Sequence, residues 1–303
     1  MEKISGFSLV RNGVRFDYPF IESLRSLLPV VDELVLNVGK GDDETLEVCR
    51  RFAEEEGAGK VVLFESAWPL DDPEKRKSGI ILSEQTNLAL DRCSNDWCLY
   101  LQADEVLHEA DHGIIRRGVE CAKQLGLDAL VFEYRHLYGS FDVIQDSRSA
   151  YRREVRAIRR SSGARSVGDA QSFLKPGEEK PAALLTRARI FHYGWVRTPE
   201  AMREKTRFMD TLYHGAAAAG SDLPHTGDNY RYRRFWGLYP YRGGHPAVME
   251  RRIREKGWHW DLAGSPWVFT WKDLSKAVLD LFERLTGIRP FEFRNYELKG
   301  ILE

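Results

Sequence analysis

The sequence predicts an α/β fold built on a parallel sheet. Three apolar runs of strand length, residues 4–10, 33–38 and 60–65, alternate with two segments of helical apolar spacing, 17–28 and 44–56. Such alternation is typical of a parallel sheet with helices on both faces, because a crossover helix must connect successive parallel strands. With 303 residues, 43% of them hydrophobic, the chain is long enough for one large α/β domain with an appendage.

Turn and loop signals follow these first elements. Arg11-Asn12-Gly13 marks a turn after the first strand. Residues 67–79 interrupt the alternation with two prolines and the cations Lys75, Arg76 and Lys77. A segment so polar and broken indicates a loop at the edge of the sheet. Its cations are either solvated or close over bound phosphates.

A strand at residues 97–101 carries the strongest functional signal. This apolar, aromatic run ends in Gln102-Ala103-Asp104-Glu105 and is followed by the predicted helix 108–125. Open α/β sheets bind ligands at the carboxyl ends of their strands, and carboxylate oxygens hold divalent cations that in turn hold diphosphates. The alternative is that the acids merely favour the dipole of the helix that follows.

Further strands and a helix are predicted in the second half of the chain. Residues 127–134, 151–160 and 184–196 have strand-like composition, and the last of them contains His192 near its end. A helix is expected over 199–214, since Pro199 suits a first helical turn.

From residue 215 onward the sequence predicts an appendage. Residues 216–220 form a small, flexible link, and 230–242 interleave aromatic residues with cations. Two further helices are expected at 246–256 and 272–285. The aromatic and basic segment suits acceptor sugars, a membrane surface, a subunit interface or a packed core equally well.

Composition excludes several classes of protein. A formal net charge of -1 does not steer the molecule towards nucleic acid, so no nucleic-acid partner is expected. The four cysteines lack zinc-site spacing and are expected to be reduced thiols of a cytoplasmic protein. No signal peptide and no apolar run of about 20 residues is present, so no transmembrane segment is expected.

Four motifs resemble those of the family 2 glycosyltransferases, nucleotide-sugar enzymes with the GT-A fold. They are Ser8 to Asn12 after the first strand, Gly41 to Leu46 in the second loop, Gln85-Thr86-Asn87 in a helix, and Leu101 to Glu105. The last is similar to the DxD motif of that family. The resemblance covers roughly residues 4–196.

The resemblance implies a division of the chain and a mixed, mostly parallel sheet of Rossmann-like type with helices on both faces. Residues 1–196 would form the GT-A catalytic domain, with a nucleotide-binding half at about 1–105 and an acceptor half at about 106–196. Residues 197–303 would form a mainly helical C-terminal extension with an acceptor or oligomer surface.

The resemblance also implies roles for residues at matching positions. Asp104 and His192 would bind the metal, with Glu105 in a supporting role, and Asp169 would be the general base. The residues expected to bind the donor are Leu9, Val10, Arg11, Asn12, Asp42, Asp43, Gln85, Asn87, Gln102, Ala103, Asp104, Gly139 and Arg153.

Each role has a structural alternative. Asp169 would instead cap the turn after Gly168, and His192 would be an ordinary core histidine. The arginines of 151–160 would mostly lie on a solvated strand face, with Arg153 or Arg156 facing the diphosphate or an anionic acceptor.

Two positions depart from the family pattern. Gln102 stands where the first motif aspartate is usual, and Val38-Gly39 stands where the second strand usually ends in a base-binding acid. The identity of the nucleotide base is therefore left open.

The predicted function is that of an inverting glycosyltransferase of the hexosyltransferase class, dependent on Mn²⁺ or Mg²⁺. It would move a sugar from a nucleotide-sugar to a hydroxyl of a glycan, lipid-linked or protein acceptor, with peripheral contact to the inner membrane surface and homo-oligomers both left open. The alternatives are a nucleotide-sugar-binding protein without turnover and a sugar nucleotidyltransferase. The latter needs a phosphate loop that Arg11-Asn12-Gly13 poorly supplies.

Overall fold

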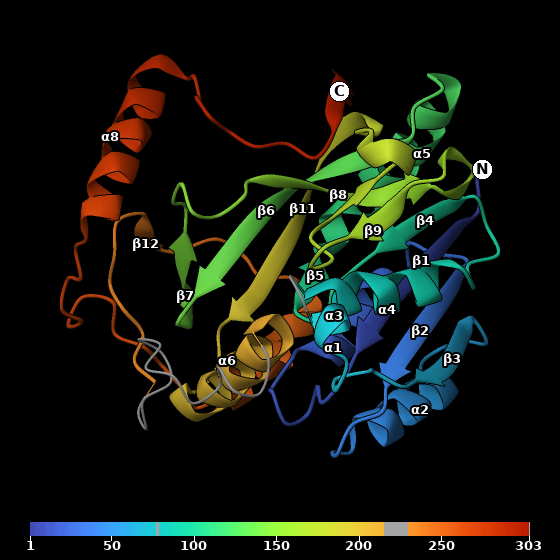
Figure 1. Cartoon of the computed structure of the whole chain (residues 1–303), viewed down its shortest axis with the longest axis horizontal. Helices are drawn as coiled ribbons and strands as arrows, with labels where there is room; N and C mark the ends of the chain where they lie inside the picture. Colours follow the sequence, from blue (N-terminus) through green and yellow to red (C-terminus); the bar gives the residue numbers. More distant parts are fainter. Residues whose placement is uncertain (77–78, 215–229, 303) are drawn as a thin grey trace.

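The computed structural model describes residues 1–76, 79–214 and 230–302, apart from the side chains of Arg76, His214 and Lys272 (Figure 1). Lys77 and the predicted link 216–220 lie outside the described residues. The first part of the chain confirms the predicted alternation of strands and helices. Its elements are β1 (Ile4–Val10), α1 (Phe20–Leu27), β2 (Glu33–Gly39), α2 (Thr45–Glu55) and β3 (Val61–Ser66).

These three strands form the parallel part of the sheet. β1 pairs with β2 in a register that sets Val10 beside Val38, and β2 pairs with β3. The predicted loop 67–79 contains the short helix α3 (Pro73–Arg76) and leads into α4 (Ile80–Leu90). β4 (Trp97–Tyr100) then pairs with the free edge of β1, also in parallel. The carboxyl ends of β1 and β4 therefore lie together at one edge of the sheet.

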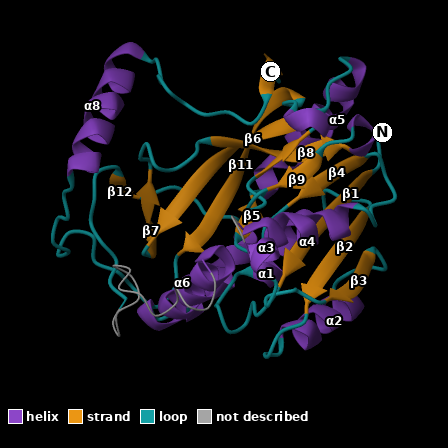
Figure 2. Cartoon of the chain, viewed as in Figure 1, coloured by secondary structure: helices purple, strands orange, loops and turns teal. Residues whose placement is uncertain are grey.

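The rest of the sheet is mixed (Figure 2). β8 (Arg153–Arg159) is inserted antiparallel between β4 and β6 (Ala129–Tyr138), and β11 (Ala182–Trp195) runs parallel to β6. The predicted mixed α/β fold class is thereby confirmed. The remaining strands are β5 (Glu105–Leu107), β7 (Ser140–Gln145), β12 (Leu238–Pro240), β13 (Glu297–Ile301) and the separate pair β9 (Arg165–Val167) and β10 (Ser172–Leu174).

Helices cover both faces of the sheet because strand residues point alternately to opposite sides. Leu34 and Leu36 belong to a core with α1, α2 and α5 (His112–Gln124), whereas Val35 belongs to a second core with α4. A 3-10 turn at Glu109–Asp111 precedes α5, so the predicted helix 108–125 begins later than expected.

The chain after residue 196 is not separate from the sheet. β13 pairs with β11, and α6 (Pro199–His214) lies across the end of the sheet (Figure 1). The expected helices near 246–256 and 272–285 are α7 (Glu250–Glu255), after a 3-10 turn, and α8 (Trp271–Thr286). Residues after 196 therefore contribute a strand to the same sheet as the first part of the chain. No helix among the described residues combines the length and apolarity that a membrane crossing requires.

Candidate functional site

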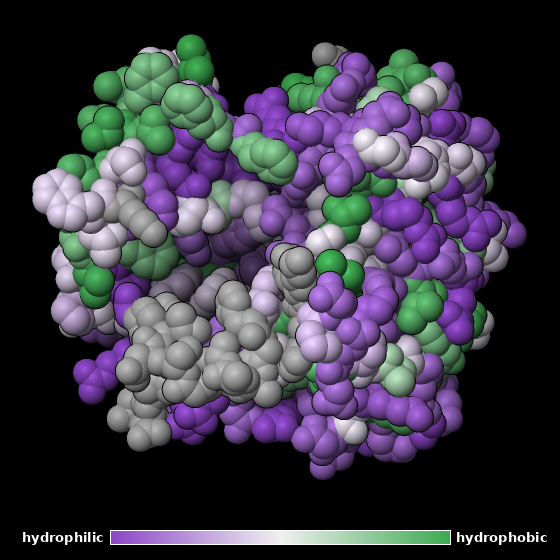
Figure 3. All heavy atoms as spheres, in the orientation of Figure 1, coloured by the Kyte–Doolittle hydropathy of each residue, from purple (hydrophilic) through white to green (hydrophobic). Residues whose placement is uncertain are grey.

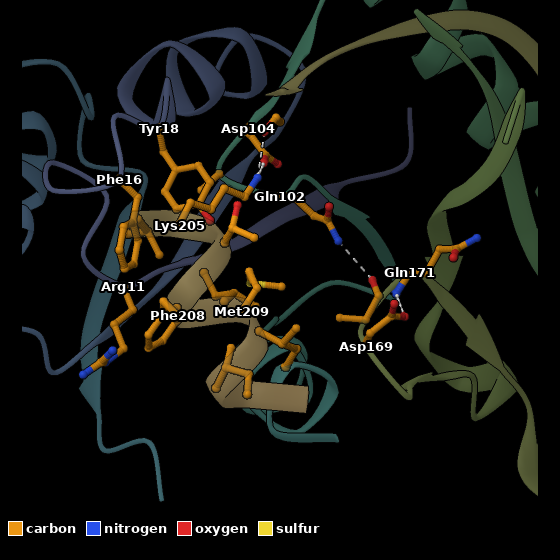
Figure 4. A pocket seen from close by; sticks show the side chains of 18 of the residues that line it. Arg11, Phe16, Tyr18, Gln102, Asp104, Asp169, Gln171, Lys205, Phe208 and Met209 are labelled. Atoms are coloured by element: carbon orange, nitrogen blue, oxygen red, sulfur yellow. Dashed lines mark hydrogen bonds and ion pairs between the residues drawn. The ribbon is translucent and has the colours of Figure 1, made fainter. Parts of the chain in front are cut away.

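A cavity of about 570 Å³ lies at the carboxyl ends of β1 and β4, with α6 as one wall (Figure 4). It brings together eight of the residues singled out from the sequence. These are Leu9, Val10, Arg11, Gln102, Ala103, Asp104, Asp169 and His192. The cavity thus lies at the edge of the sheet where the strand-end argument expects a ligand site.

Asp104 is the most buried acid of this cavity, with 7% of its surface exposed. Its Oδ2 lies 3.2 Å from Nζ of Lys205 on α6, and its Oδ1 lies 3.8 Å from Nε2 of His192. Burial by itself would raise the pKa of Asp104, but the charges of Lys205 and Arg197, and that of His192 once it is protonated at low pH, outweigh burial and lower that pKa. Asp104 is therefore a carboxylate at neutral pH.

The hydrogen bonds of two histidines fix which ring nitrogen of His192 faces Asp104. Nε2 of His136 lies 2.7 Å from the carbonyl oxygen of Tyr151, which can only accept, so this nitrogen carries the proton. Burial lowers the pKa of His136 to about 3, so its ring is neutral and Nδ1 is an acceptor. Nδ1 of His192, 3.0 Å away, must then be the donor.

This chain of bonds leaves Nε2 of His192 with a lone pair directed towards the Asp104 carboxylate. Burial lowers the pKa of His192 although Asp104 opposes this, which favours the neutral ring. A lone pair and a carboxylate 3.8 Å apart repel each other unless a cation lies near both. A Cβ on Gly194 would lie 2.5 Å from that Nε2 and 3.0 Å from Oδ2 of Asp104, so only glycine leaves the space open.

Asp104 and His192 fit a divalent cation that a ligand completes. Mg²⁺ and similar ions commonly take one or two protein ligands and gain the others from water and substrate phosphates. No cluster of three or more His, Cys, Asp or Glu side chains suited to a metal occurs in the part of the chain that the structure describes. Lys205 competes with a cation for Asp104, because its ammonium donates to Oδ2 of that carboxylate at 3.2 Å. The same ammonium donates to the carbonyl of Gly194 at 2.9 Å.

Glu105, the expected supporting ligand, points to the opposite side of the backbone and has another role. Its side chain is fully buried and accepts two hydrogen bonds from Arg156, at 2.8 and 2.9 Å. Tyr134 and the backbone of Gln102 donate two more, at 2.8 and 3.1 Å. With all four acceptor positions occupied, Glu105 is not available to a metal, and Arg156 is not available to a diphosphate.

Asp169 lies on the wall of the cavity opposite Asp104 (Figure 4). It is exposed, and its carboxylate accepts hydrogen bonds from the backbone of Gln171 at 3.3 Å and the hydroxyl of Tyr213 at 3.2 Å. The amide of Gln102 donates to the carbonyl of Ala170 at 3.2 Å and so ties this loop to the end of β4. Each oxygen of this carboxylate has one partner and can accept a second hydrogen bond, so the group can still accept from a hydroxyl in the cavity.

β2, which lacks the base-binding acid usual in the GT-A family, ends beside Trp68. A Cβ on Gly39 would lie 2.4 Å from Nε1 of Trp68, so glycine admits the indole to the cavity wall. This Nε1 is buried and has no hydrogen-bond partner among the described residues. The guanidinium of Arg11 lies 5.8 Å from the Trp68 ring and 5.1 Å from the Phe208 ring. Two aromatic faces, a cation and an indole donor thus occupy this end.

Three expected donor-binding residues hold the first loops in place. Asn12, in the left-handed region with a φ of 51°, donates from its amide to Asp42 at 2.6 Å. Asp43 accepts from the backbone of Arg15 and of Thr45, at 2.8 and 3.0 Å. None of the three lines the cavity.

Four others also lie away from it. Gln85 bonds to Asn37 and Ser66 inside the sheet–helix core, and Asn87 ties α4 to β9 through the backbone of Ser166. A Cβ on Gly139, whose φ is +72°, would lie 2.3 Å from Trp260, so this glycine permits close packing. Arg153 lines a second cavity instead.

That second cavity, of about 460 Å³, adjoins the first. Both are lined by Tyr151, and His136 of the second is bonded to His192 of the first. Arg135, Arg152 and Arg153 contribute cations to its wall, beside Glu133 and Asp146.

The sequence reasoning missed Lys205, Tyr18 and Trp68. All three line the first cavity, and Lys205 lies 5.1 Å from the ring of Tyr18. The helix that carries Lys205 was predicted with its correct end but assigned to the extension. The position of Lys205 on the apolar side of that helix could have indicated that this lysine faces a cavity rather than solvent.

Comparisons with known proteins find solved structures of low sequence identity. No protein-family model and no curated protein matches the sequence. TarS from S. aureus has a TM-score of 0.40 and 16% identity over 73% of this chain, and this chain spans only 40% of TarS. TarS has also been solved with UDP-GlcNAc.

Two further solved structures are similar at the same level. GalNAc-T7 with UDP, GalNAc and Mn²⁺ has a TM-score of 0.41 and 10% identity over 70% of this chain and 48% of its own. The mannosyltransferase PcManGT from Pyrobaculum calidifontis, in complex with GDP-Man and Mn²⁺, has a TM-score of 0.32 and 18% identity over 43% and 34%. Scores this low carry no argument about activity, so the functional case rests on the geometry of this chain.

Proposed function

We propose that this chain is a GT-A glycosyltransferase that moves a sugar from a nucleoside-diphosphate-sugar to an acceptor hydroxyl. The observation that carries the proposal is the pair formed by Asp104 and His192. A buried carboxylate and a histidine lone pair face each other across a glycine-lined gap, inside a cavity large enough for a nucleotide-sugar.

The two ends of the cavity suit different parts of the donor. Trp68, Phe208 and Arg11 present aromatic faces and a cation at one end, which favours stacking of a planar base. Asp104, His192 and Lys205 occupy the other end, where a diphosphate would lie. The Lys205 ammonium then donates to a phosphate oxygen and neutralises charge as the diphosphate leaves.

A divalent cation, Mn²⁺ or Mg²⁺, held by Asp104 and His192 would supply Lewis-acid stabilisation of the leaving diphosphate. His136 positions this site, because its bond to His192 holds the ring in the tautomer that directs Nε2 at Asp104. The fully buried Glu105–Arg156 pair keeps the strand end rigid beneath it.

Asp169 is the proposed general base. It lies across the cavity from the diphosphate end, so an acceptor hydroxyl between them would attack from the face opposite the leaving group and give inversion. The second cavity, which meets the first at Tyr151, would hold the acceptor. Its three arginines are paired with Glu133, Asp146 and Glu283, so they do not by themselves select an anionic acceptor. Hexosyl specificity, cytoplasmic location and oligomeric state stay predictions.

A thermal-shift panel tests the proposal. We expect one nucleoside diphosphate to stabilise the protein in the presence of Mn²⁺ or Mg²⁺ and less without it, because ligands that bind only the native state raise its stability. Absence of any metal-dependent shift with every nucleotide would refute the proposal. A shift without donor hydrolysis or sugar transfer would identify a nucleotide-sugar-binding protein instead.

A further inference from the structure

Helix α8 lies beyond β7 and β12, at the far edge of the molecule from α5 (Figure 1). Polar contacts hold it there. Asp280 accepts hydrogen bonds from the indole of Trp236 at 3.0 Å and from Arg284 at 2.9 Å. Glu283 is paired with Arg148 at 3.1 Å, with Arg289 at 3.2 Å and with Arg152. Asp280 is 2% exposed and Glu283 is 9% exposed, so the side of α8 that faces the protein is charged.

The opposite side of α8 is apolar and exposed. Five large residues recur there every three or four positions, with exposed fractions from 43% to 87%. They are Trp271, Leu274, Val278, Leu281 and Leu285. A surface helix normally buries its apolar side and exposes its charged side, so α8 is inverted. The space-filling view shows hydrophobic side chains gathered over this corner of the molecule (Figure 3).

The apolar surface continues beyond both ends of the helix. Trp267 and Phe269 precede it and are 54% and 57% exposed. Ile288, Phe291 and Phe293 follow it and are 61%, 91% and 78% exposed. A second helix packed along α8 would cover the helical residues and leave these five in water. A lipid surface accepts all of them, and aromatic rings suit the boundary between acyl chains and headgroups.

The charges around this surface favour anionic lipid. Two acids of α8 are turned inward, and the third, Asp273, is bound to Thr270 in the helix cap. Cations lie beside the exposed aromatic rings at both ends: Arg234 is 4.5 Å from the ring of Trp267, and Lys180 is 5.2 Å from that of Phe293.

We propose that α8 and its flanking segments, residues 267–293, form a docking face that inserts its apolar side chains into the headgroup region of an anionic lipid bilayer. The inference stands on this face alone and does not depend on the transferase activity. Arg152 joins Glu283 of α8 to the wall of the second cavity, so docking would bring the rim of that cavity to the membrane.

Co-sedimentation of the full chain with vesicles tests the docking face. We expect binding to phosphatidylcholine vesicles that contain phosphatidylglycerol, and weaker binding to phosphatidylcholine alone. Leu281→Glu and Leu285→Glu should each weaken binding by about tenfold or more, because a charge replaces a side chain that loses water on insertion. Leu125→Glu is the matched control, since Leu125 is 60% exposed just after α5, at the opposite end of the molecule.

The circular dichroism spectrum and the cooperative thermal unfolding of all three variants should match those of the wild-type chain, which shows that each is folded. The proposal is overturned if the wild-type chain does not bind vesicles containing phosphatidylglycerol, or if Leu125→Glu loses as much binding as Leu281→Glu. It is also overturned if light scattering finds a dimer that Leu281→Glu dissociates while vesicle binding is absent. That result would assign the face to a second copy of the chain.

Discussion

Replacing Glu105 by glutamine separates a structural role from a metal-binding role at the centre of the sheet. The carboxylate accepts on Oε1 from Tyr134 and Arg156, and on Oε2 from Arg156 and the backbone of Gln102. An amide of the same shape has one accepting oxygen and one donating nitrogen. Two of the four hydrogen bonds therefore become contacts between donors, and the buried guanidinium loses its counter-charge.

The expected cost follows from these contacts. A lost hydrogen bond to a charged group costs about 1.5–3 kcal/mol, and an unsatisfied buried backbone N–H costs about 1–3 kcal/mol. Breaking a buried ion pair by removing one partner costs about 3–5 kcal/mol, which agrees with that sum. Both side chains of the Glu105–Arg156 pair are 0% exposed, so solvent does not screen the loss. We expect a loss of about 3–5 kcal/mol, or roughly 5–8 °C in Tm for a chain of this size.

Denaturant unfolding of Glu105→Gln and of Glu133→Gln provides the measurement and its control. Glu133 pairs with Arg153 at 3.5 Å and with Arg135 at 4.0 Å, at a side chain that is 24% exposed. Its replacement should cost under about 1 kcal/mol. If Glu105→Gln costs no more than the control while Mn²⁺ affinity falls, Glu105 is a metal ligand and the structural reasoning is wrong.

Three other substitutions probe the site and its surroundings. Asp169→Asn should lower turnover by about 10²–10⁴ with the nucleotide-induced thermal shift unchanged, since only proton removal is lost, and near-normal turnover would exclude Asp169 as the base. Lys205→Met should tighten Mn²⁺ binding without nucleotide by about tenfold, because an ammonium 3.2 Å from the carboxylate of Asp104 repels the metal; calorimetry that shows no gain would contradict this competition. Burial lowers the pKa of Lys256 to about 7, and its Nζ has no hydrogen-bond partner among the described residues. Between pH 7 and about 10 this lysine is protonated in the unfolded chain but not in the folded one, so the free energy of unfolding should rise by up to about 1.4 kcal/mol per pH unit. Lys256→Met should remove this rise. An unchanged slope of unfolding free energy against pH would refute the prediction.

Local patterns were enough to predict the fold class and the strand end at which the candidate cavity lies. Apolar runs and helical spacing are properties of neighbouring residues, and they predict the ends of β1, β2, β3 and β4 to within one residue. The resemblance to the GT-A family implied that Asp104 and His192 share a metal site, so the two residues were expected near each other before any contact was known. The distance of 3.8 Å between their side chains agrees with that expectation.

The partners of these side chains depended on contacts across long stretches of sequence. Asp104 lies in the turn after β4, whereas Glu105 begins β5, and β8 brings Arg156 to Glu105. α6 brings Lys205 to Asp104, although the two residues are 101 positions apart in the sequence. Strand order and helix docking arise from the packing of the whole core. The sequence therefore determined that acids stand at this strand end, and the tertiary structure decided that Asp104 faces the cavity while Glu105 is buried with Arg156.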